Sequence, residues 1–450
     1  MCQVLRDAWA LAIEALCWIE QKKMSERLAL IKASKELNVQ NSSARGLAHK
    51  LVLETVKRQN FLDYLLNYVL EPNFVNNFDS GVRAFLRLYA YQTKIRGSDS
   101  YEKAASIAGI GRSLLGWRRM KEAEEALGTL LSIEPNEVFK GLKDAEKVSL
   151  QTFQPLWFVK YCFKLLGRYE ALQYFRSILS NPPTYIRVNT LKVSGEELLE
   201  KIRDEGIILE KVRGLSHTYK VVEQKQLLTR TSSFKNGSFY IQDKASCLAA
   251  EVAAPTNGMT MVDVCAAPGA KTTYFAQLME NQGTIFSIDY SRRRIKVWKR
   301  EVERMGVKIA MPIIEDAYNP LPLYNVKADI VFLDPPCTST GAFSRLPSAK
   351  WRLSKRLMKR MVDIQWRMLN NCAEFVKEGG NLVYSTCSIT LEENEILIER
   401  FLKWNPDFTL IEINPRIGLP GLRGQTNSQR LYPHFHECNG FFIAKLTKYA

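Results

Sequence analysis

The sequence has no CxxC pair and few histidines, the features typical of disulfide-rich and zinc-bound proteins. Nine of its 450 residues are cysteine, none of them in a CxxC pair, and four are histidine. These numbers exclude a disulfide framework and a zinc ribbon, so we expect free thiols, a reducing compartment and no metal ion. His434 and His436 alternate near the C-terminus without cysteine or carboxylate partners in register, which leaves that expectation unchanged.

Long uncharged apolar runs are also missing. No stretch approaches the roughly 18 residues that a membrane span needs. The apolar first 23 residues are interrupted by Arg6, Asp7, Glu14 and Glu20, which indicates a surface helix rather than a signal peptide. We therefore expect a cytoplasmic protein without a membrane span.

Negative charge is in short supply as well. Lys and Arg number 63 against 47 Asp and Glu, which gives a net charge of +16. The excess favours a polyanionic partner such as RNA or DNA, with a generally basic surface as the alternative. Hydrophobic residues make up 46% of the chain, enough to bury real cores, and 450 residues predict two or three domains at about 150 residues each.

The periodicity of the apolar residues changes twice along the chain. From residue 1 to 145 they recur at helical spacing, which predicts an all-α domain. Residues 151–235 predict a small α+β domain, in which a helix opened by Ser194, with Glu197 at capping-box spacing, lies between two strands. Residues 236–450 alternate short β runs with amphipathic helices, which predicts an α/β domain.

The α/β domain is predicted to be Rossmann-like, with helices on both faces of the sheet. Its strand candidates are residues 260–265, 284–290, 308–314, 328–334 and 381–387. Helices separate most of them, and this alternation gives a mostly parallel sheet. Two final runs, 408–413 and 440–447, have no helix of useful length between them, so we expect an antiparallel hairpin at the sheet edge.

Small and acidic residues follow the first three strands, at the end where doubly wound sheets bind ligands. The loop of residues 265–272 has small side chains and leads into a helix N-terminus. A phosphate-binding P-loop does not fit, since Cys265 replaces its first glycine and Ala270 precedes the lysine. Asp289 and Asp316 end the next two strands, and carboxylates there suit a ribose and an adenine, as in sites for NAD or S-adenosylmethionine. Each acid alone could instead cap a helix or a turn.

Cysteines follow the fourth and fifth strands. Cys337 comes shortly after Asp334, and Cys387 ends the next strand. One such cysteine is usually a small buried hydrophobic residue, but two at neighbouring strand ends predict a shared pocket. Methyl transfer to C5 of a pyrimidine needs this equipment, because a thiolate must add to C6 before C5 becomes nucleophilic. A hydrogen-bond partner near N3 must then stabilise the charge that develops.

In their order, these motifs resemble those of the Sun/Fmu–nucleolar (NOL/NOP/Sun) family of RNA 5-methylcytosine methyltransferases. The resemblance rests on VDVCAAPGAKT, SIDYSRRRI, IEDA, FLDPPCTSTG, VYSTCSITLEENE and RLYPHFHECNGFFIAKL, and it extends from residue 151 to the end. The helices of residues 1–145 resemble by their pattern the NusB-like RNA-binding domain of bacterial small-subunit ribosomal RNA members. The resemblance therefore favours ribosomal RNA as the substrate, with transfer RNA as the alternative.

The resemblance also implies catalytic roles. Cys387 would be the nucleophile that attacks C6, and Cys337 would help to resolve the covalent adduct. Asp334 would contact the cytosine edge and the cofactor, while Lys271 would orient groups in the active site.

The implied cofactor is S-adenosylmethionine. Asp289 would hold its ribose and Asp316 its adenine. The other residues that the resemblance places around the cofactor are Cys265, Ala266, Ala267, Pro268, Gly269, Ala270, Lys271, Arg294 and Asp334.

Two positions depart from the family pattern. Ala270 replaces the commoner glycine, which matters only if the backbone there needs a positive φ. Pro336 replaces a frequent alanine, which makes residues 334–337 partly similar to the motif of base-amino methyltransferases. Those enzymes stack the target base on an aromatic ring that Cys337 lacks, so base N-methylation is the second candidate activity. A non-catalytic RNA-binding factor and a nicotinamide oxidoreductase, whose GxGxxG motif is missing, are less favoured.

Two basic stretches are candidates for RNA contacts. The first is a stripe on one predicted helix, formed by Arg352, Lys355, Arg356, Lys359 and Arg360. A solvated amphipathic helix is the alternative there. In the helical domain, Trp117 beside Arg118 and Arg119 could stack on a base or could be a core tryptophan. We expect the protein to act as a monomer.

Overall fold

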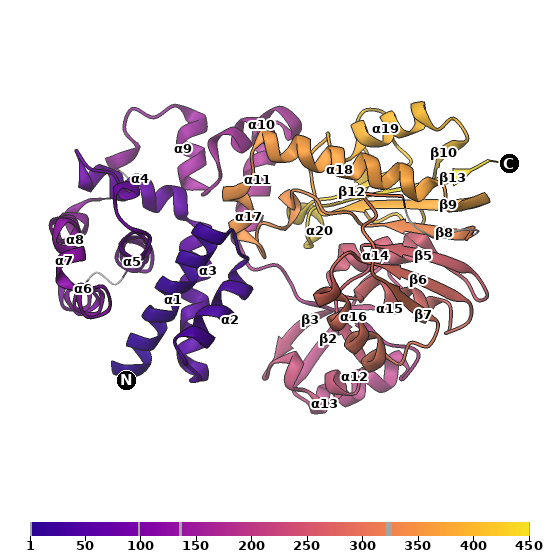
Figure 1. Ribbon diagram of the computed structural model, residues 1–450, viewed down its shortest axis with the longest axis horizontal. Coiled ribbons are helices and arrows are strands. Elements are labelled where there is room, and N and C mark those ends of the chain that lie inside the picture. Colours follow the sequence, from indigo (N-terminus) through magenta and orange to yellow (C-terminus); the bar gives the residue numbers. More distant parts are fainter. Residues whose placement is uncertain (1, 98–99, 135–136, 321–325, 450) are drawn as a thin grey trace. The chain divides into compact units, whose positions relative to one another are not determined.

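The computed structural model describes residues 2–97, 100–134, 137–320 and 326–449 (Figure 1). These residues form two compact units. Unit 1 comprises residues 1–180 and 343–352, and unit 2 comprises residues 181–342 and 353–450. Within the described residues, every helix is too short or too polar to cross a lipid bilayer.

Unit 1 is all helical, as the sequence predicts for the first domain. Its α-helices are α1 (Cys2–Lys22), α2 (Glu26–Glu36), α3 (Ser42–Lys57), α4 (Gln59–Leu70), α5 (Ser80–Ala90), α6 (Tyr101–Leu115), α7 (Trp117–Met120), α8 (Glu124–Ser132), α9 (Asp144–Gln151), α10 (Leu156–Leu166), α11 (Arg168–Leu179) and α17 (Pro347–Arg352). Short turns η1 (Val75–Asn77), η2 (Tyr91–Ile95), η3 (Lys121–Ala123) and η4 (Glu137–Phe139) join some of them. Asp79 caps α5 by accepting hydrogen bonds from two backbone amides, and the apolar faces of the helices bury Trp9, Leu62 and Phe85.

Unit 1 extends beyond the predicted domain boundary. Residues 151–180, which the sequence places in the α+β region, form α10 and α11 instead. Their buried apolar residues recur at helical spacing, as Phe158, Val159 and Cys162 do in α10. The helical segment ends just before Pro182 and Pro183.

A second segment of unit 1, residues 343–352, comes from far along the chain, between Cys337 and helix α18 (Lys355–Ala373). Lys350 donates hydrogen bonds to the backbone carbonyls of Lys57 (2.6 Å) and Phe153 (2.7 Å). Trp351 Nε1 donates to the carbonyl of Val56 at 2.6 Å. Burial and nearby cationic side chains hold the pKa of Lys350 well below its usual range. Residues 343–352 are therefore built into the helical core rather than lying on its surface.

Unit 2 begins with a small antiparallel sheet of strand order β2-β3-β1-β4. Its elements are β1 (Tyr185–Val188), α12 (Gly195–Asp204), β2 (Ile207–Lys211), β3 (Thr218–Gln224), η5 (Leu228–Arg230), α13 (Ser232–Lys235) and β4 (Phe239–Ile241). The predicted capping box is present, because Ser194 Oγ accepts from the Glu197 amide and the Glu197 carboxylate accepts from the Ser194 amide.

The main sheet of unit 2 has strand order β11-β12-β13-β9-β8-β5-β6-β7, and β10 pairs with β13. Its strands are β5 (Thr260–Val264), β6 (Thr284–Ile288), β7 (Ala310–Ile313), β8 (Ala328–Leu333), β9 (Val376–Thr386), β10 (Phe408–Ile411), β11 (Leu419–Pro420), β12 (Gln429–Leu431) and β13 (Phe441–Lys448). Its helices are α14 (Lys244–Ala253), α15 (Ala270–Leu278), α16 (Arg292–Met305), α18 (Lys355–Ala373), α19 (Glu395–Trp404) and α20 (Pro433–His436), with the turn η6 (Thr340–Ala342).

Helices cover both faces of this sheet, and the strands from β7 to β9 are parallel. Val331 and Leu333 of β8 face one hydrophobic core, while Ile330 and Phe332 face the other. The predicted mostly parallel sheet is confirmed. The final two predicted strands do pair antiparallel, as β10 and β13, but they are not a simple edge hairpin, because β13 also pairs with β9 and with β12.

Candidate active site

The candidate site residues follow the carboxyl ends of the parallel strands of the main sheet. The loop of residues 265–269 follows β5, Asp289 follows β6, and Asp316 lies beyond β7. Asp334 follows β8, and Cys387 follows β9. Because these five strands are parallel, their carboxyl ends lie on the same side of unit 2.

The two strand-end cysteines are in direct contact. The sulfur atoms of Cys337 and Cys387 lie 3.2 Å apart, and the hydroxyl of Ser339 lies 3.5 Å from Cys387 Sγ. The hydrogen bond with Cys337 lowers the pKa of Cys387 in spite of burial. The same bond, together with burial, raises the pKa of Cys337 well above its usual range. Cys387 is therefore the more readily ionised thiol of the pair, an order that the sequence alone does not give.

An ion pair lies at the same edge. Lys271 Nζ is 2.6 Å from Asp334 Oδ2, and Ser385 Oγ donates to Asp334 Oδ1 at 3.3 Å. Burial lowers the pKa of Lys271, but the Asp334 carboxylate more than offsets it and raises the pKa above its ordinary value. Lys271 therefore keeps its proton, and Asp334 has a fixed orientation.

One acidic side chain of this region, Asp263, is not predicted from the sequence. Asp263 lies inside β5 and is 1% exposed, and Thr272 Oγ1 donates to its carboxylate at 2.5 Å. Burial raises the pKa of Asp263 to about 7. The available signal was an acid within the otherwise apolar run of residues 260–265. Asp263 ties β5 to the first turn of α15, next to Lys271.

The small-residue loop after β5 is closed by hydrogen bonds to Asp289. This carboxylate accepts from the Ala267 amide at 3.3 Å and forms an ion pair with Arg294 at 3.1 Å. Arg294 also donates to the carbonyl of Ala267. Gly269 has a φ of 108°, whereas Ala270 is not among the residues with positive φ, so the alanine causes no strain there.

Two further loop residues have specific surroundings. Burial raises the pKa of Cys265 well above its usual range, so this cysteine remains a thiol. Asp316 is exposed, and its carboxylate accepts from the Tyr318 amide at 3.0 Å. The turn-capping alternative is therefore realised at Asp316, at the edge where an adenine would lie.

The predicted basic stripe is not on a single helix. Arg352 ends α17 in unit 1 and donates to the carbonyl of Lys23 at 2.9 Å. A new helix, α18, begins after Ser354, whose hydroxyl accepts from the Leu357 amide. The prediction that Arg352 shares one helix with the other four residues is wrong, because the N-cap at Ser354 starts a new helix. The remaining four side chains of the stripe lie exposed on α18: Lys355, Arg356, Lys359 and Arg360.

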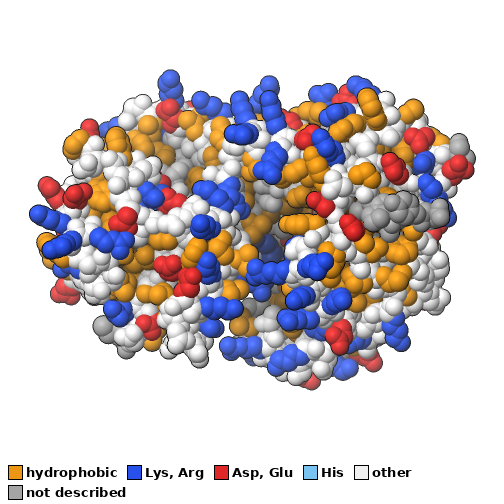
Figure 2. Space-filling model, in the orientation of Figure 1, with side chains coloured by type: hydrophobic (Ala, Val, Ile, Leu, Met, Phe, Trp, Pro, Cys, Tyr) orange, Lys and Arg blue, Asp and Glu red, His pale blue; other side chains and the backbone are white. Residues whose placement is uncertain are grey.

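Unit 1 also exposes the aromatic residue with an ambiguous role. Trp117 is 57% exposed, so it is not a core tryptophan. Arg118 beside it is exposed, and Arg119 forms an ion pair with Asp79. Figure 2 shows Lys and Arg side chains spread across the visible face among fewer acidic ones, in line with the net charge of +16.

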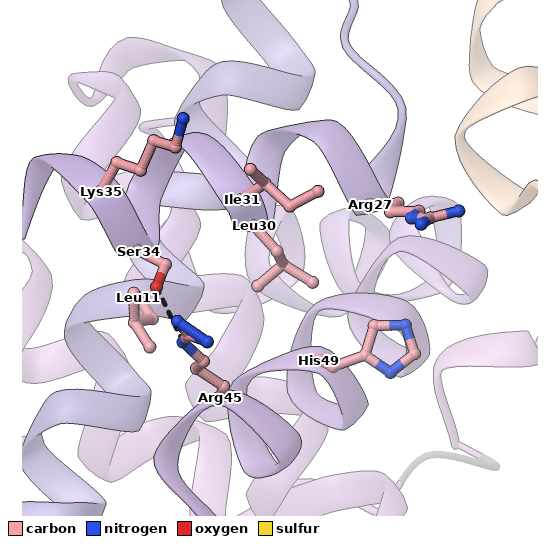
Figure 3. Close-up of a pocket in the computed structure, with 8 residues that line it drawn as sticks. All are labelled: Leu11, Arg27, Leu30, Ile31, Ser34, Lys35, Arg45 and His49. Atoms are coloured by element: carbon pink, nitrogen blue, oxygen red, sulfur yellow. Dashed lines mark hydrogen bonds between the residues drawn. The ribbon is translucent and has the colours of Figure 1, made fainter. Parts of the chain in front are cut away.

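The helical unit has a surface hollow of its own, of about 420 Å3, between α1, α2 and α3 (Figure 3). Its wall is apolar at Leu11, Leu30 and Ile31. Its other lining residues are Arg27, Ser34, Lys35, Arg45 and His49. Arg45 Nε donates to Ser34 Oγ at 2.9 Å. No residue with a predicted catalytic role lines this hollow.

Metal-ligand clusters are not found in the part of the chain that the structure describes: no group there brings three or more His, Cys, Asp or Glu side chains into coordinating range. Of the two alternating histidines, His436 accepts a hydrogen bond from the Tyr432 amide through Nδ1 at 2.9 Å. This bond is internal to the turn around α20.

Known proteins resemble the whole chain as well as its sheet. Residues 250–447 match the family described as 16S rRNA methyltransferase RsmB/F. The chain is 32% identical to a probable ribosomal RNA small subunit methyltransferase B of Bacillus subtilis, over 97% of this chain and 98% of that one. It is also 38% identical to a tRNA (cytosine(72)-C(5))-methyltransferase of Pyrococcus horikoshii, over 49% of this chain and 55% of that one.

Solved structures are also similar to this chain. The crystal structure of PH0851 superimposes with a TM-score of 0.82 at 28% identity, covering 98% of this chain and 99% of that one. The crystal structure of NSun6 from Pyrococcus horikoshii with SFG gives a TM-score of 0.60 at 27% identity, covering 65% of this chain and 97% of that one.

A mostly parallel sheet with a small-residue loop, acidic residues and a thiol pair at its carboxyl end, together with these matches, identifies a Rossmann-like, S-adenosylmethionine-dependent methyltransferase. The match to the Bacillus subtilis relative over nearly the whole chain identifies the family within this class. The chain belongs to the RsmB/F (Sun) family of RNA 5-methylcytosine methyltransferases.

Proposed function

We propose that this protein transfers a methyl group to C5 of a cytosine in small-subunit ribosomal RNA, with Cys387 as the covalent nucleophile. The observation that carries the proposal is the contact between Cys337 and Cys387, in which the hydrogen bond from one thiol lowers the pKa of the other. A pair of thiols with unequal acidity suits a reaction that needs one thiolate to attack and a second group to help release the product.

The loop after β5 fits S-adenosylmethionine. Ala266, Ala267 and Gly269 present little side chain, so a ligand can approach the backbone, and α15 begins directly after them. Asp289 secures this loop and is the proposed ribose contact, while Asp316 is the proposed adenine contact at the next strand end. When bound, the cofactor supplies an electrophilic methyl group.

The chain's own residues then have distinct proposed tasks. The Cys387 thiolate attacks C6 of the cytosine, which makes C5 nucleophilic. The Lys271 ammonium, whose pKa is raised, donates a hydrogen bond to the pyrimidine as negative charge develops, and the Asp334 carboxylate orients both Lys271 and the cytosine amino group. After the methyl group is transferred to C5, the C5 proton is lost to a base and the C6–sulfur bond breaks, which returns Cys387 as a thiolate. Cys337, which keeps its own proton, assists this release by donating a hydrogen bond to the departing sulfur.

A direct assay tests this proposal. Incubation of the protein with small-subunit ribosomal RNA and methyl-labelled S-adenosylmethionine is expected to place the label on C5 of cytosine. The nucleoside is identified by digestion and mass spectrometry, with heat-treated protein as the control. Label on an exocyclic nitrogen would instead support the base-amino alternative.

The choice of RNA is a separate part of the proposal. Ribosomal RNA is favoured because the chain matches a probable ribosomal RNA small subunit methyltransferase B over nearly its whole length, whereas the tRNA (cytosine(72)-C(5))-methyltransferase matches about half of it. The helical residues 1–145 would serve as a NusB-like RNA-binding domain. The small sheet of β1 to β4, residues 185–241, would serve as the RNA-recognition subdomain predicted for residues 151–235. The rest of unit 2 would be the catalytic domain, predicted as residues 236–450, of a protein that acts as a monomer without a metal ion. Bisulfite mapping of cellular RNA with and without the protein distinguishes the two substrates.

The exposed basic residues of α18 are proposed to bind RNA phosphates. We expect the double variant Arg356→Gln, Lys359→Gln to weaken RNA binding and to reduce the slope of log K against log salt concentration by about 0.7–0.9 for each phosphate that is no longer neutralised. Binding is measured by filter retention at several salt concentrations. The matched variant Lys403→Gln, Arg423→Gln, whose residues both pair with Glu399, should keep the original slope. An unchanged slope in the first variant would remove α18 from the RNA interface.

A further inference from the structure

Two loops carry the active-site cysteines: the loop after β8 with Cys337 and the loop after β9 with Cys387. Both of these cysteine loops are hydrogen-bonded to one buried carboxylate, that of Glu393, which is 0% exposed. Its Oε1 accepts from the Thr338 amide at 2.8 Å and from Gln365 Nε2 at 2.9 Å. Its Oε2 accepts from the hydroxyls of Thr338 (2.5 Å), Ser388 (2.6 Å) and Thr390 (2.8 Å). One side chain thus joins the loop after β8, the loop after β9 and helix α18.

The five contacts suit an ionised carboxylate, which can only accept hydrogen bonds. No Lys or Arg of the described chain forms an ion pair with Glu393, so hydrogen bonds alone compensate for removing its charge from water. If either cysteine loop moved away, this buried charge would lose donors at a high energetic cost. The carboxylate therefore restrains both loops at once.

The restraint is applied directly beside the reactive sulfur atoms. Thr338 is the residue after Cys337, and Ser388 is the residue after Cys387. A backbone hydrogen bond from Gly341 to the carbonyl of Cys387, at 2.9 Å, ties the same two loops together. The contact of 3.2 Å between the two sulfur atoms lies within this frame.

We propose that Glu393 is a positioning residue for methyl transfer, which holds Cys337 and Cys387 in the mutual arrangement that the reaction needs. It contacts neither sulfur atom, and it acts through Thr338 and Ser388. The inference rests on the proposed function, in which these two thiols do the chemistry.

The pKa of Cys387 distinguishes a positioning role of Glu393 from a purely electrostatic one. The Cys337 hydrogen bond is the main cause of the lowered Cys387 pKa, whereas the negative charge of Glu393 acts in the opposite direction. If Glu393 only contributes charge, its neutralisation lowers the Cys387 pKa further. If it holds the thiols together, the same substitution loosens the bond from Cys337 and raises the Cys387 pKa.

The variant Glu393→Gln tests this in the full-length protein. Alkylation of Cys387 by iodoacetamide, followed by peptide mass spectrometry from pH 5 to 10, is expected to show its midpoint moved to higher pH. We expect kcat to fall by about ten- to a hundred-fold, the scale of a misplaced catalytic group, while KM for S-adenosylmethionine stays within about two-fold. The matched control is Glu251→Gln, a buried carboxylate that accepts from Ser216 and Tyr274, away from the cysteine loops, and it should leave the alkylation midpoint unchanged.

A second variant keeps the test decisive if the first fails to fold, as judged by circular dichroism and cofactor binding. Ser388→Ala removes one of the five donors and is expected to shift the midpoint in the same direction by a smaller amount. A midpoint that stays in place or moves to lower pH, together with unchanged kcat, overturns the positioning role. The proposed function is judged separately: wild-type protein that forms no covalent adduct with RNA carrying 5-fluorocytosine fails that proposal, whereas the alkylation profile still reports on Glu393.

Discussion

Methyl transfer is expected to fall by about 10⁴-fold or more when Cys387 is replaced by serine, as it does on loss of the nucleophile in other enzymes with covalent intermediates. A serine hydroxyl stays protonated at neutral pH, so it cannot attack C6 as the thiolate does. The measurement is incorporation of labelled methyl into RNA under single-turnover conditions. Cys17→Ser, which changes a half-buried cysteine of unit 1, should retain full turnover. Full activity of the Cys387 variant would contradict the assignment of the nucleophile.

The pH dependence of the same reaction follows from the lowered Cys387 pKa. The reactive form is the thiolate, so the rate should rise with pH through the Cys387 pKa and level off above it. Because the pKa is lowered, the midpoint should lie below that of an unperturbed cysteine. In the variant Cys337→Ala the hydrogen bond that lowers this pKa is gone, and the midpoint of Cys387 alkylation should move upward.

The variant Cys337→Ala is expected to accumulate a covalent protein–RNA adduct. Cys387 can still attack C6, but the thiol proposed to assist departure of the Cys387 sulfur is missing, so the adduct decays slowly. The adduct is detected as a species of reduced mobility on a denaturing gel, and it should disappear after nuclease digestion of the RNA.

Two further variants complete this experiment. The double variant Cys337→Ala, Cys387→Ser should form no adduct, because the attacking thiol is absent. Cys372→Ala, which changes a buried cysteine of α18, should form no more adduct than the wild type. Normal turnover of Cys337→Ala without accumulation of adduct would show that Cys337 has no part in product release.

Much of this site could be predicted from strand ends alone. Parallel strands bring their carboxyl ends to one edge, so Cys337 and Cys387 were expected to share a pocket although 50 residues separate them, and their sulfur atoms are in contact. The pair of Lys271 and Asp334 follows from the same geometry. Sequence position does not, however, give the relative acidity of two neighbouring thiols, because that depends on which one donates the hydrogen bond between them.

Other features depend on contacts that no local pattern contains. The basic stripe appeared continuous because Arg352 and Lys355 are at helical spacing, and only the cap at Ser354 divides it into two helices. Glu393 belongs to the motif VYSTCSITLEENE, but its importance comes from donors on three separate segments. Asp263 lies in a run that predicts an apolar strand, although a buried acid in such a strand needs a partner, here Thr272.

The insertion of residues 343–352 into the helical unit has a consequence for how this protein can be taken apart. The chain passes between the two units three times, after Ser180, Ala342 and Arg352, so no single truncation separates them. In a fragment that lacks the N-terminal helices, Lys350 and Trp351 would lose the carbonyl groups that accept their hydrogen bonds. A minimal catalytic fragment therefore requires that residues 343–352 be excised and replaced by a short linker. Exchange of the N-terminal region between homologues would succeed only if residues 343–352 were exchanged with it.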